Sequence, residues 1–393
     1  MQIQVTNSID TVAAADWDRL NPDGNPFLRH AFLAALEHHD CVGETFGWLP
    51  HHLLARDEQR RLVGAVPLYF KTNSYGEFVF DWAWADASER AGMHYYPKAV
   101  VAIPYTPVTG RRLLIDPTLP DPEPVRRGLI EAAGELACEQ GLSSLHWLFP
   151  DATDTDSLES AGYLLRLGCQ YHWTQPGYRD FDDFLDTFSA HKRKKLRRER
   201  RRVIEAGIEH RIVHGHEADE SHWRIMHRYY QSTFDKKWGT ATLNLPFFRE
   251  LGATMGEQVV LIFACIDARP VAGALCFRSP SALYGRHWGC EADYHSLHFE
   301  TCYYQGIDYC IREGLSLFEP GAQGEHKVSR GFLPTPTWSA HWIAQPRLRD
   351  AIADFLSREQ RAMRDYIHTL NAEHLPYKAD RLPPAARHVR RID

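Results

Sequence analysis

Polar and charged residues follow two short apolar runs in the C-terminal half of the chain. The run that begins at Leu283 leads into Arg286, His287 and Trp288. The run at 315–318 is followed by Glu319 and by a loop with two glycines, whose polar side chains are Gln323, Glu325, His326 and Lys327. Carboxylate, imidazole and amine groups can move protons and stabilise charge, so these residues are candidates for a catalytic or ligand-binding site. The alternative is a solvated surface loop, which is where adjacent charged residues usually lie.

A strand, a helix and a second strand are expected to position these residues. The run 283–288 is a predicted strand and 315–318 a second one, and between them 299–311 is a predicted helix with apolar residues four apart, ended by Gly314. Two strands joined by a crossover helix of this length are parallel, and ligands bind beyond the carboxyl ends of such strands. The polar ends of both strands should therefore meet, and Glu300 and Tyr303 of the helix are added to the predicted binding set.

A metal site in this region is a weaker alternative. His298, Glu300 and His326 are possible ligand types. However, the chain has neither an HExxH pattern nor the Cys/His spacing of structural zinc sites, so we expect no metal.

Length and composition restrict the class of protein. A chain of 393 residues is too long for one ordinary core, so two domains are expected. Its 44% hydrophobic and 24% charged content is that of a globular protein. No apolar run has the length of a membrane span and the first residues do not form a leader, so we expect a cytoplasmic protein. The eight cysteines form no CxxC pair and are expected to be reduced thiols, several of them buried.

Two pairs of similar segments, in the same order, indicate an internal duplication. RRLVGAVPLYF (60–70) resembles ARPVAGALCFR (268–278), and ELACEQGLSSLHWLF (135–149) resembles YCIREGLSLFEP (309–320). The sequence therefore predicts an α/β (α+β) protein of two similar domains, 1–178 and 179–393. Other predicted elements are a hairpin of strands 53–56 and 62–70, a strand at 145–149, and helices at 27–38, 121–139, 222–234, 245–254 and 347–370.

An aromatic-rich region at about 75–117 looks like an insertion in the first domain. Walls of Trp and Tyr with a few charges suit a sugar or amino-acid ligand, although a small aromatic core is an equal alternative. Its candidate binding residues are Asp81, Tyr95, Tyr96 and Lys98.

A predicted helix at about 184–206 is strongly basic. Between His191 and Arg202 there are nine Lys or Arg and one Glu. So many cations on about three turns repel one another unless an anionic partner is near. The overall charge of −6 excludes a general nucleic-acid binder, but this segment fits the phosphates of an RNA. A solvated face compensated by the acidic residues at 180–186, or a negatively charged membrane surface, are the alternatives. The candidate phosphate-binding residues are Lys192, Arg193, Lys194, Lys195, Arg197 and Arg198.

Several of these stretches resemble the FemAB-like group of N-acyltransferases, relatives of the Fem peptidyltransferases of peptidoglycan synthesis. The similar stretches cover about 25–342 and include SYGEFVFDWAWADA, YYPK, TPVTGRRLL, HKRKKLRRERR, GRHWG, LHFETCYYQ, FEPGAQGEHKVSRGF and SAHW. The resemblance implies two tandem GNAT (acetyltransferase-type) folds. It also implies transfer of an acyl or aminoacyl group to an amine, such as that of a peptidoglycan precursor or small molecule, from aminoacyl-tRNA or from acyl-CoA.

Under this resemblance the polar residues acquire roles. Glu319 or His287 would accept the proton of the attacking amine, and Lys327 with the NH groups near Gly321 and Gly324 would stabilise the oxyanion. The lysine placement is similar to that in Fem enzymes. After Trp288 the chain reads GCEADYHSLHF, without the glycine-rich loop that holds the pyrophosphate of CoA. We therefore expect no bound cofactor and aminoacyl-tRNA as donor, with acyl-CoA as the alternative. A non-catalytic protein that binds cell-wall precursors is the other alternative.

Overall fold

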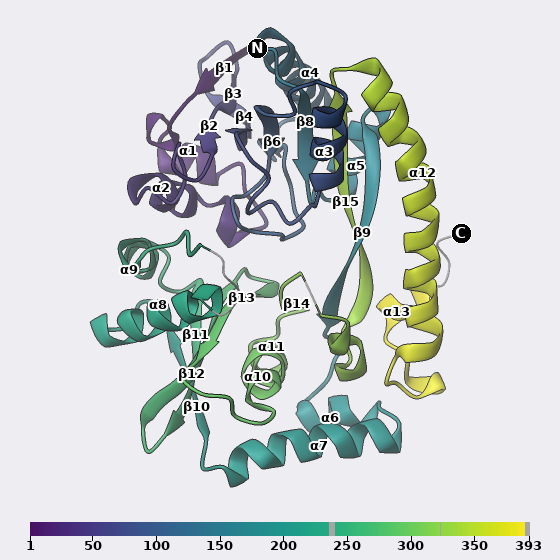
Figure 1. The fold of residues 1–393 in the computed structure, drawn as a ribbon. Coiled ribbons are helices and arrows are strands. Elements are labelled where there is room, and N and C mark those ends of the chain that lie inside the picture. The colour runs from purple at the N-terminus through teal and green to yellow at the C-terminus, as the bar shows by residue number, and fades with distance from the viewer. Residues whose placement is uncertain (236–239, 323, 390–393) are drawn as a thin grey trace. The chain divides into compact units, whose positions relative to one another are not determined.

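The computed structural model describes residues 1–235, 240–322 and 324–389, which form two compact units (Figure 1). Unit 1 comprises Met1–Gly168 and Pro336–Arg364, and unit 2 comprises Cys169–Thr335 and the segment that begins at Asp365. Two long strands cause this division: β9 (Leu164–Thr174) begins in unit 1 and ends in unit 2, and β15 (Leu333–Ile343) does the reverse. The units thus differ from the contiguous 1–178 and 179–393 halves expected from the sequence.

Unit 2 is built on a mixed sheet whose strand order is β10-β11-β12-β13-β14-β9. Strands β10 (Glu209–His214), β11 (Val259–Ile266), β12 (Arg269–Arg278) and β13 (Ala282–Cys290) pair antiparallel. The two-residue turn between β11 and β12 has positive φ at Asp267 and Ala268, as a tight hairpin requires. Strand β14 (Leu317–Glu319) is parallel to β13 and antiparallel to β9, so the predicted parallel pair is confirmed.

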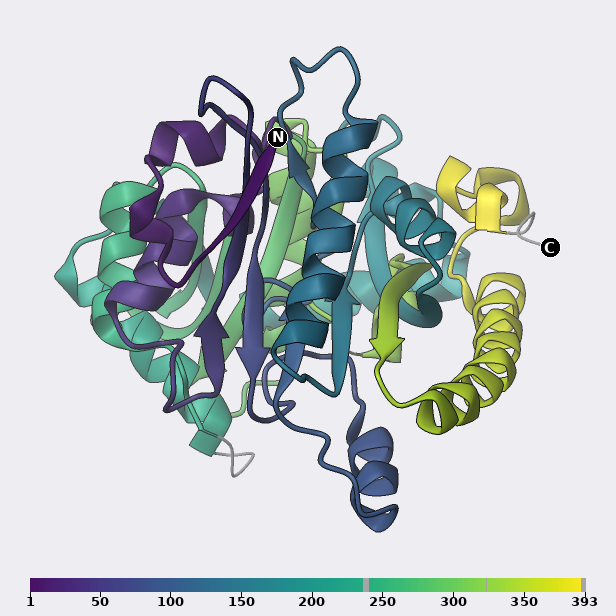
Figure 2. The same cartoon turned by 90° about the horizontal axis from the view of Figure 1, so that it is seen from above.

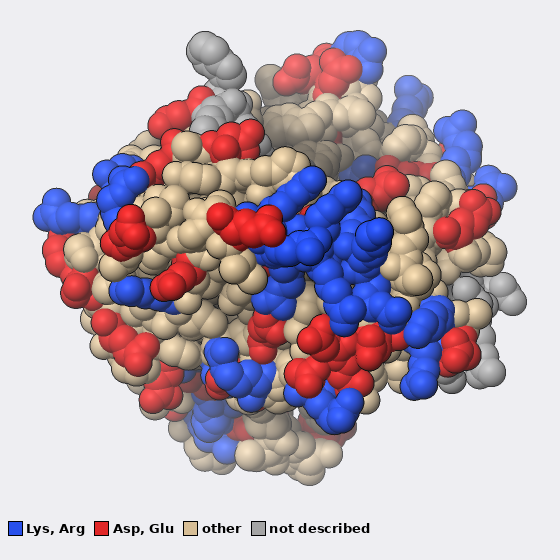
Figure 3. All heavy atoms as spheres, turned by 90° about the horizontal axis from the view of Figure 1, so that it is seen from below, with Lys and Arg blue, Asp and Glu red and all other residues tan. Residues whose placement is uncertain are grey.

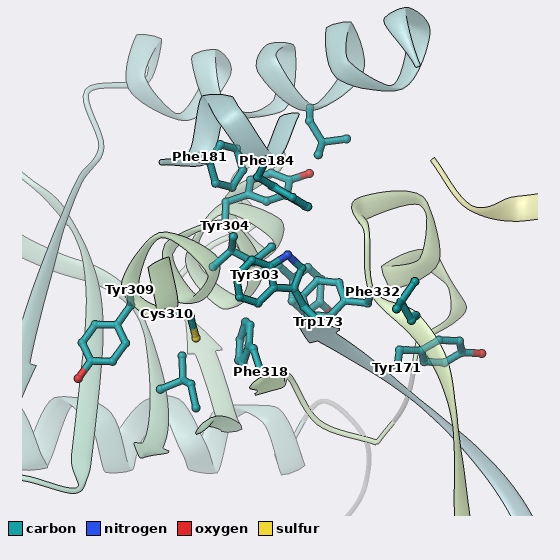
Figure 4. Packing of buried hydrophobic residues seen from close by; sticks show 14 of the residues in the cluster. Tyr171, Trp173, Phe181, Phe184, Tyr303, Tyr304, Tyr309, Cys310, Phe318 and Phe332 are labelled. Atoms are coloured by element: carbon teal, nitrogen blue, oxygen red, sulfur yellow. The ribbon is translucent and has the colours of Figure 1, made fainter. Parts of the chain in front are cut away.

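The helix between β13 and β14 lies tightly against the sheet. It consists of α10 (Leu297–Phe299), a π-helical turn at Glu300–Tyr304 and α11 (Gln305–Glu313), and Gly314 ends it with φ 68°. A Cβ on Gly306 would approach the Phe318 ring to 2.5 Å, so glycine permits this contact. The buried aromatic cluster in Figure 4 joins this helix to its sheet and includes Tyr303, Tyr304 and Phe318. Helices α8 (Glu220–Asp235) and α9 (Leu245–Thr254) complete this part of the unit.

The basic segment forms two helices instead of the single one predicted at 184–206. Helix α6 (Phe181–Asp186) is capped by Asp180, whose carboxylate accepts the Asp183 NH at 2.8 Å. After a break, α7 (Ala190–Glu205) begins. The break lets the rings of Phe181, Phe184 and Phe188 enter the core, which a straight helix could not do together with the buried residues of α7.

Unit 1 contains two sheets. One has the order β1 (Gln2–Thr6), β3 (His52–Arg56), β4 (Leu62–Val66), β7 (Leu114–Ile115), and the other has the order β15, β8 (Ser144–Leu148), β6 (Lys98–Val101), β5 (Leu68–Lys71), β2 (Trp48–Pro50). The predicted hairpin of β3 and β4 is confirmed. The predicted strand 62–70, however, is divided at Pro67, because proline has no NH for a strand ladder.

The aromatic-rich region 75–117 includes elements of the fold of unit 1. It contains α3 (Trp82–Arg90) and the central strand β6, which is parallel to β8. Helix α4 (Glu123–Glu139) connects β6 to β8 and covers their sheet together with α5 (Ala152–Ser160), as Figure 2 shows. Each unit therefore has a parallel strand pair bridged by a helix, and in both the helix is followed by a glycine with positive φ, Gly141 or Gly314.

The remaining helices are α1 (Ala14–Asp18), α2 (His30–His38), α12 (Pro346–Thr369) and α13 (Pro384–Val389). None of the helices in the described ranges combines the length and apolarity needed to cross a membrane. All eight cysteines are free, and Cys265 and Cys276 are buried as predicted.

Candidate functional site

Strands β13 and β14 diverge where the predicted site begins. Their pairing ends with Tyr284 opposite Glu319. One residue further, the register between β12 and β13 shifts: Cys276 pairs with Gly285 and Leu275 with His287, so Arg286 is the extra residue of a bulge. A Cβ on Gly285 would lie 3.2 Å from the Pro320 backbone, so the chain after β14 passes very close to this glycine.

Arg286, Glu319 and His172 form a polar group at this divergence. Burial lowers the pKa of Arg286 to about 10, and the carboxylate of Glu319 acts in the opposite direction. The His172 Nε2 lies 3.9 Å from Glu319 Oε2 and 3.3 Å from Gln170 Oε1. Burial, with the charge of Lys327, lowers the pKa of His172 to about 3, so this ring is neutral near pH 7.

Lys327 lies in a short 3₁₀ segment, Glu325–Arg330, which follows the glycine loop. The side chain is buried, and its Nζ donates a hydrogen bond to the Gly321 carbonyl at 2.6 Å. The Nζ is 5.8 Å from the centre of the Tyr303 ring. Burial lowers the pKa of Lys327 to about 7. This amine can therefore both hold and release a proton near neutral pH.

His287 and Trp288 pack against rings of neighbouring elements. The His287 ring packs against Tyr230, at 4.7 Å between ring centres, and burial lowers its pKa to about 3. Trp288, the next residue, packs against His298 at 5.3 Å. These are the packing contacts of a strand in a folded core. They place neither residue next to Glu319.

The other predicted residues of the loop and helix divide into two groups. Tyr303 OH and His326 Nε2 are 2.9 Å apart, so both belong to the surroundings of Lys327. Glu325 accepts a hydrogen bond from the Tyr366 hydroxyl at 3.1 Å. Glu300 instead accepts from Arg200 Nε at 3.2 Å and from Gln305 at 2.8 Å, which gives it a structural ion pair. Gln323 lies outside the described residues.

A second polar group is buried in unit 1, around Lys98. Its ammonium group donates to Ser74 Oγ at 2.8 Å, to Glu77 Oε2 at 2.9 Å and to Asp81. Tyr95 donates to Asp81 Oδ2 at 2.6 Å, and Tyr96 OH is 2.8 Å from Ser74 Oγ. The structure thus brings together the four residues predicted in this region.

Burial and the charge of Lys98 act in opposite directions on the two carboxylates of this group. Burial opposes ionisation of Asp81, but the charges of Lys98 and His146 outweigh it and lower the pKa to about 2. For Glu77 burial prevails and raises the pKa to about 7. The network continues through His146, whose Nδ1 is 2.6 Å from Nδ1 of His341, and both imidazoles have lowered pKa values because they are buried.

Aromatic side chains on the same segment point outward. Ser74, Glu77 and Asp81 are buried against Lys98, whereas the exposed large side chains between and beside them are Tyr75, Phe78, Phe80 and Trp82. Tyr75 and Trp82 contact each other edge to face at 5.1 Å between ring centres. A segment with polar residues inside and aromatic residues outside provides an accessible aromatic surface.

The basic face of α7 carries a shallow hollow of about 330 Å³, lined by Ala190, Arg193, Lys194, Arg197 and Arg201. The lysine and arginine side chains gather there in one patch beside an acidic one (Figure 3). Arg197 pairs with Asp182 at 3.0 Å and Arg193 with Asp186 at 3.4 Å, so the acidic neighbours compensate part of the charge. Lys194, Arg197 and Arg198 are exposed, and Lys192, Arg193 and Lys195 are partly exposed.

The segment between β13 and the helix that begins at Leu297 is acidic. Ser296, just before this helix, is in the left-handed region at φ 68°. The preceding residues include Glu291, which pairs with Arg269 at 2.9 Å, and the loop carries the further acid Asp293. Negative side chains at this place do not favour a pyrophosphate. Within the described ranges, His, Cys, Asp and Glu side chains form no group of three that could hold a metal.

Sequence reasoning missed His172, Gln170, Glu77 and His146. Gln170 and His172 alternate with Tyr171 and Trp173 along β9, and the polar members of a buried strand could have been singled out. Glu77 lies four residues before Asp81 in the quoted motif. His146 lies in a buried strand and had no comparable signal.

The two units, each with a helix-bridged parallel pair flanked by antiparallel strands, define a tandem GNAT-like fold. Solved structures with this arrangement include FemX, at 10% identity and a TM-score of 0.55 over 90% of this chain and 100% of that chain. The C-terminal domain of a putative lysylphosphatidylglycerol synthetase from Agrobacterium fabrum aligns at 10% identity and 0.51, over 89% and 97% of the two chains. A tandem GNAT protein from the clavulanic acid biosynthesis pathway aligns at 13% identity and 0.45, over 88% and 99%.

The family follows from the sequence itself. A family model described as FemAB-like, peptidoglycan biosynthesis/recognition, matches residues 8–379, and the chain belongs to this family. No curated protein sequence matches the chain. The family model connects the chain with peptidoglycan biosynthesis or recognition, and the solved structures agree with its fold.

Proposed function

We propose that this protein transfers an aminoacyl group from aminoacyl-tRNA to an amine acceptor, and that unit 2 contains the reacting groups. The observation that carries the proposal is Lys327. A buried amine with a pKa of about 7 lies 2.6 Å from the Gly321 carbonyl, in the loop that begins where β13 and β14 diverge. Such an amine is suited to a reaction that both develops negative charge and needs a proton for the leaving group.

The reaction balances with the groups at this place. The neutral acceptor amine attacks the ester carbonyl, a C–N bond forms, and the carbonyl oxygen becomes an oxyanion. Lys327, in its ammonium form, donates a hydrogen bond to that oxyanion. The C–O bond to the ribose then breaks, the amine proton passes to Glu319, and the ribose oxygen takes a proton from Lys327. Glu319 is preferred as base over His287, because Glu319 lies where β13 and β14 diverge, whereas the His287 ring packs against Tyr230.

Two features support tRNA as donor over acyl-CoA. The segment between β13 and the helix that begins at Leu297 contains Glu291 and Asp293, and negative side chains at this place disfavour a pyrophosphate. The outer face of α7 presents Arg193, Lys194, Arg197 and Arg201 around one hollow, and such a surface attracts a phosphate backbone. Binding of tRNA should then weaken steeply with salt. On this proposal no bound cofactor or metal takes part.

Unit 1 is proposed to bind the acceptor. The exposed rings of Tyr75, Phe80 and Trp82 lie on the segment that Lys98 holds in place, and an aromatic surface of this kind suits a sugar or peptide. An amine-bearing peptidoglycan precursor, or a smaller amine, fits this chemistry and the description of the family.

Donor exchange tests the proposal. Purified protein is incubated with an amine-bearing muropeptide and either radiolabelled aminoacyl-tRNA or labelled acetyl-CoA. We expect label transfer from tRNA only, and transfer from CoA alone would refute the tRNA donor. Lys327→Met should abolish transfer, whereas the matched change at an exposed lysine, Lys378→Met, should leave it intact. A chain that binds the muropeptide but transfers nothing from either donor would instead be a binding protein.

A further inference from the structure

Helix α7 has an inner face that reaches the loop of Lys327. Its residues Leu196, Glu199 and Val203 are buried, at the spacing of one helix face. The basic side chains of Arg193, Lys194, Arg197 and Arg201 surround the hollow on the outer face. Glu199 is the single acid within the basic run from His191 to Arg202. A buried acid among solvent-facing cations needs a partner inside the protein.

That partner is Arg330, three residues after Lys327. The Arg330 Nη2 lies 3.0 Å from Oε1 and 3.1 Å from Oε2 of Glu199, and the two side chains are 3% and 8% exposed. Tyr304 closes the group: its hydroxyl donates to Glu199 and accepts from Arg330 Nε at 3.1 Å. The Tyr304 ring lies beside Phe181 at the end of α6 (Figure 4). Each of the three groups is thus held by the other two.

Arg330 in turn fixes the backbone next to Lys327. Its Nη1 donates to the carbonyl of His326 at 2.9 Å, and this carbonyl belongs to the peptide bond between His326 and Lys327. The guanidinium group also stacks on Phe299, 3.4 Å from the ring centre. Rotation of this peptide would break its hydrogen bond to Arg330. The ion pair between Glu199 and Arg330 therefore restricts the orientation of the Lys327 side chain.

The far end of the loop is fixed as well. Gly331 has φ 92°, and a Cβ there would lie 2.7 Å from the Phe184 ring and 2.8 Å from the Phe188 ring. The Gly331 carbonyl accepts a hydrogen bond from Tyr377 at 2.5 Å. Helix α7 also contacts the helix 297–313, which leads to β14 and this loop, because Arg200 pairs with Glu300 and, at 2.6 Å, with Asp308. The loop therefore has one firm support in α6 and α7.

We infer that Glu199 and Arg330 are positioning residues for Lys327, and that helix α7 carries two functions on its two faces, one toward an anionic partner and one toward the reacting loop. The role given to Lys327 rests on the proposed function, but its positioning does not. If the ion pair between Glu199 and Arg330 is broken, water can reach the Lys327 amine. The amine then loses the burial that lowers its pKa.

The test is the titration of Lys327 itself, without donor or acceptor. Competitive acetylation at a series of pH values, read by mass spectrometry of the Lys327 peptide, gives its apparent pKa, and exposed lysines of the same protein serve as internal references. In Glu199→Gln we expect the apparent pKa of Lys327 to rise by at least about one unit, which is roughly a fivefold fall in the neutral fraction at pH 7. The matched control Glu205→Gln removes the same charge from the same helix at an exposed pair with Arg201, and should titrate as the wild type.

A second variant covers the case in which Glu199→Gln does not fold. Tyr304→Phe removes only the hydroxyl shared by Glu199 and Arg330, and should move the titration of Lys327 in the same direction by a smaller amount. A folded Glu199→Gln or Tyr304→Phe protein that loses thermal stability while Lys327 titrates as in the wild type would overturn the inference. In the transfer assay the variants Glu199→Gln and Tyr304→Phe should have a lower kcat with little change in the KM for the donor. Arg197→Ala should instead raise the KM for the donor. Absence of transfer in the wild type would refute the proposed function and leave the titration result standing.

Discussion

Replacement of Lys98 by methionine should destabilise unit 1 strongly. The ammonium group donates to Ser74, Glu77 and Asp81 and is fully buried, so Lys98→Met leaves two carboxylates without their counter-charge. Removing one partner of a buried ion pair costs about 3–5 kcal/mol. Unit 1 has about 200 residues, a size for which each kcal/mol lowers Tm by about 2–4 °C. The expected decrease in Tm is therefore about 6–20 °C at pH 7.

The neighbouring lysine provides the control. Lys71 lies directly opposite Lys98 on β5 and is equally buried, but its ammonium donates to Asn73 Oδ1 at 3.4 Å and to the Tyr75 carbonyl at 3.2 Å, and lies 4.0 Å from the centre of the Trp48 ring. Because burial already lowers the pKa of Lys71 to about 7, Lys71→Met should lower Tm by only a few degrees. Differential scanning calorimetry measures both variants. Equal, small decreases for the two variants would refute the argument that the carboxylates make the difference.

The pH dependence gives a second check on the same variant. Without Lys98 the folded-state pKa values of Glu77 and Asp81 should lie above those of the unfolded chain, which are about 4. The destabilisation is then present above about pH 4 and fades as pH falls below that value, where both states bind the protons. Addition of Glu77→Gln and Asp81→Asn to Lys98→Met should recover most of the lost stability at pH 7.

Three further predictions concern other parts of the molecule. Lys327 has a folded-state pKa of about 7 against about 10.4 in the unfolded chain, so wild-type stability should rise between these pH values, and Lys327→Met should reduce that rise in urea titrations at pH 6 and pH 9. Gly331→Ala places a Cβ against the rings of Phe184 and Phe188 at positive φ and should cost more than about 1 kcal/mol of unfolding free energy, measured by urea denaturation. Trp82→Ser should weaken muropeptide binding in calorimetric titrations at unchanged Tm, because the ring is 42% exposed.

The local elements could be predicted from the sequence because their signals are local. The spacing of apolar residues located the helix around Tyr303, and Gly314 marked its end correctly. The polar turn 57–60 located the hairpin of β3 and β4. The one misjudged helix, at 184–206, has a continuous apolar stripe in the sequence. Only the packing of Phe184 and Phe188 into a core formed by distant residues required the break at 187–189.

The candidate sites could be predicted only in part, because their members come from distant segments. Asp81, Tyr95 and Lys98 lie within 18 residues of one another, and the structure joins them directly. His172 approaches Glu319 only through the pairing of β9 with β14, and no pattern near either residue indicates that pairing. His287 was a chemically reasonable candidate for the base. The face of the sheet to which its side chain points depends on the bulge at Arg286, and no residue type in the sequence indicates that bulge.

The two long strands impose an order on biosynthesis. Strand β8 is complete once residue 148 has been made, but its partner on one side, Ser339–Ile343 of β15, leaves the ribosome almost 200 residues later. Until then β8 has an unpaired edge, which is a template for association with other chains. Nascent chains of this protein should therefore depend on chaperones over an unusually long stretch of translation. For the same reason, a fragment that ends at Gly168 would lack the β15 partner of β8.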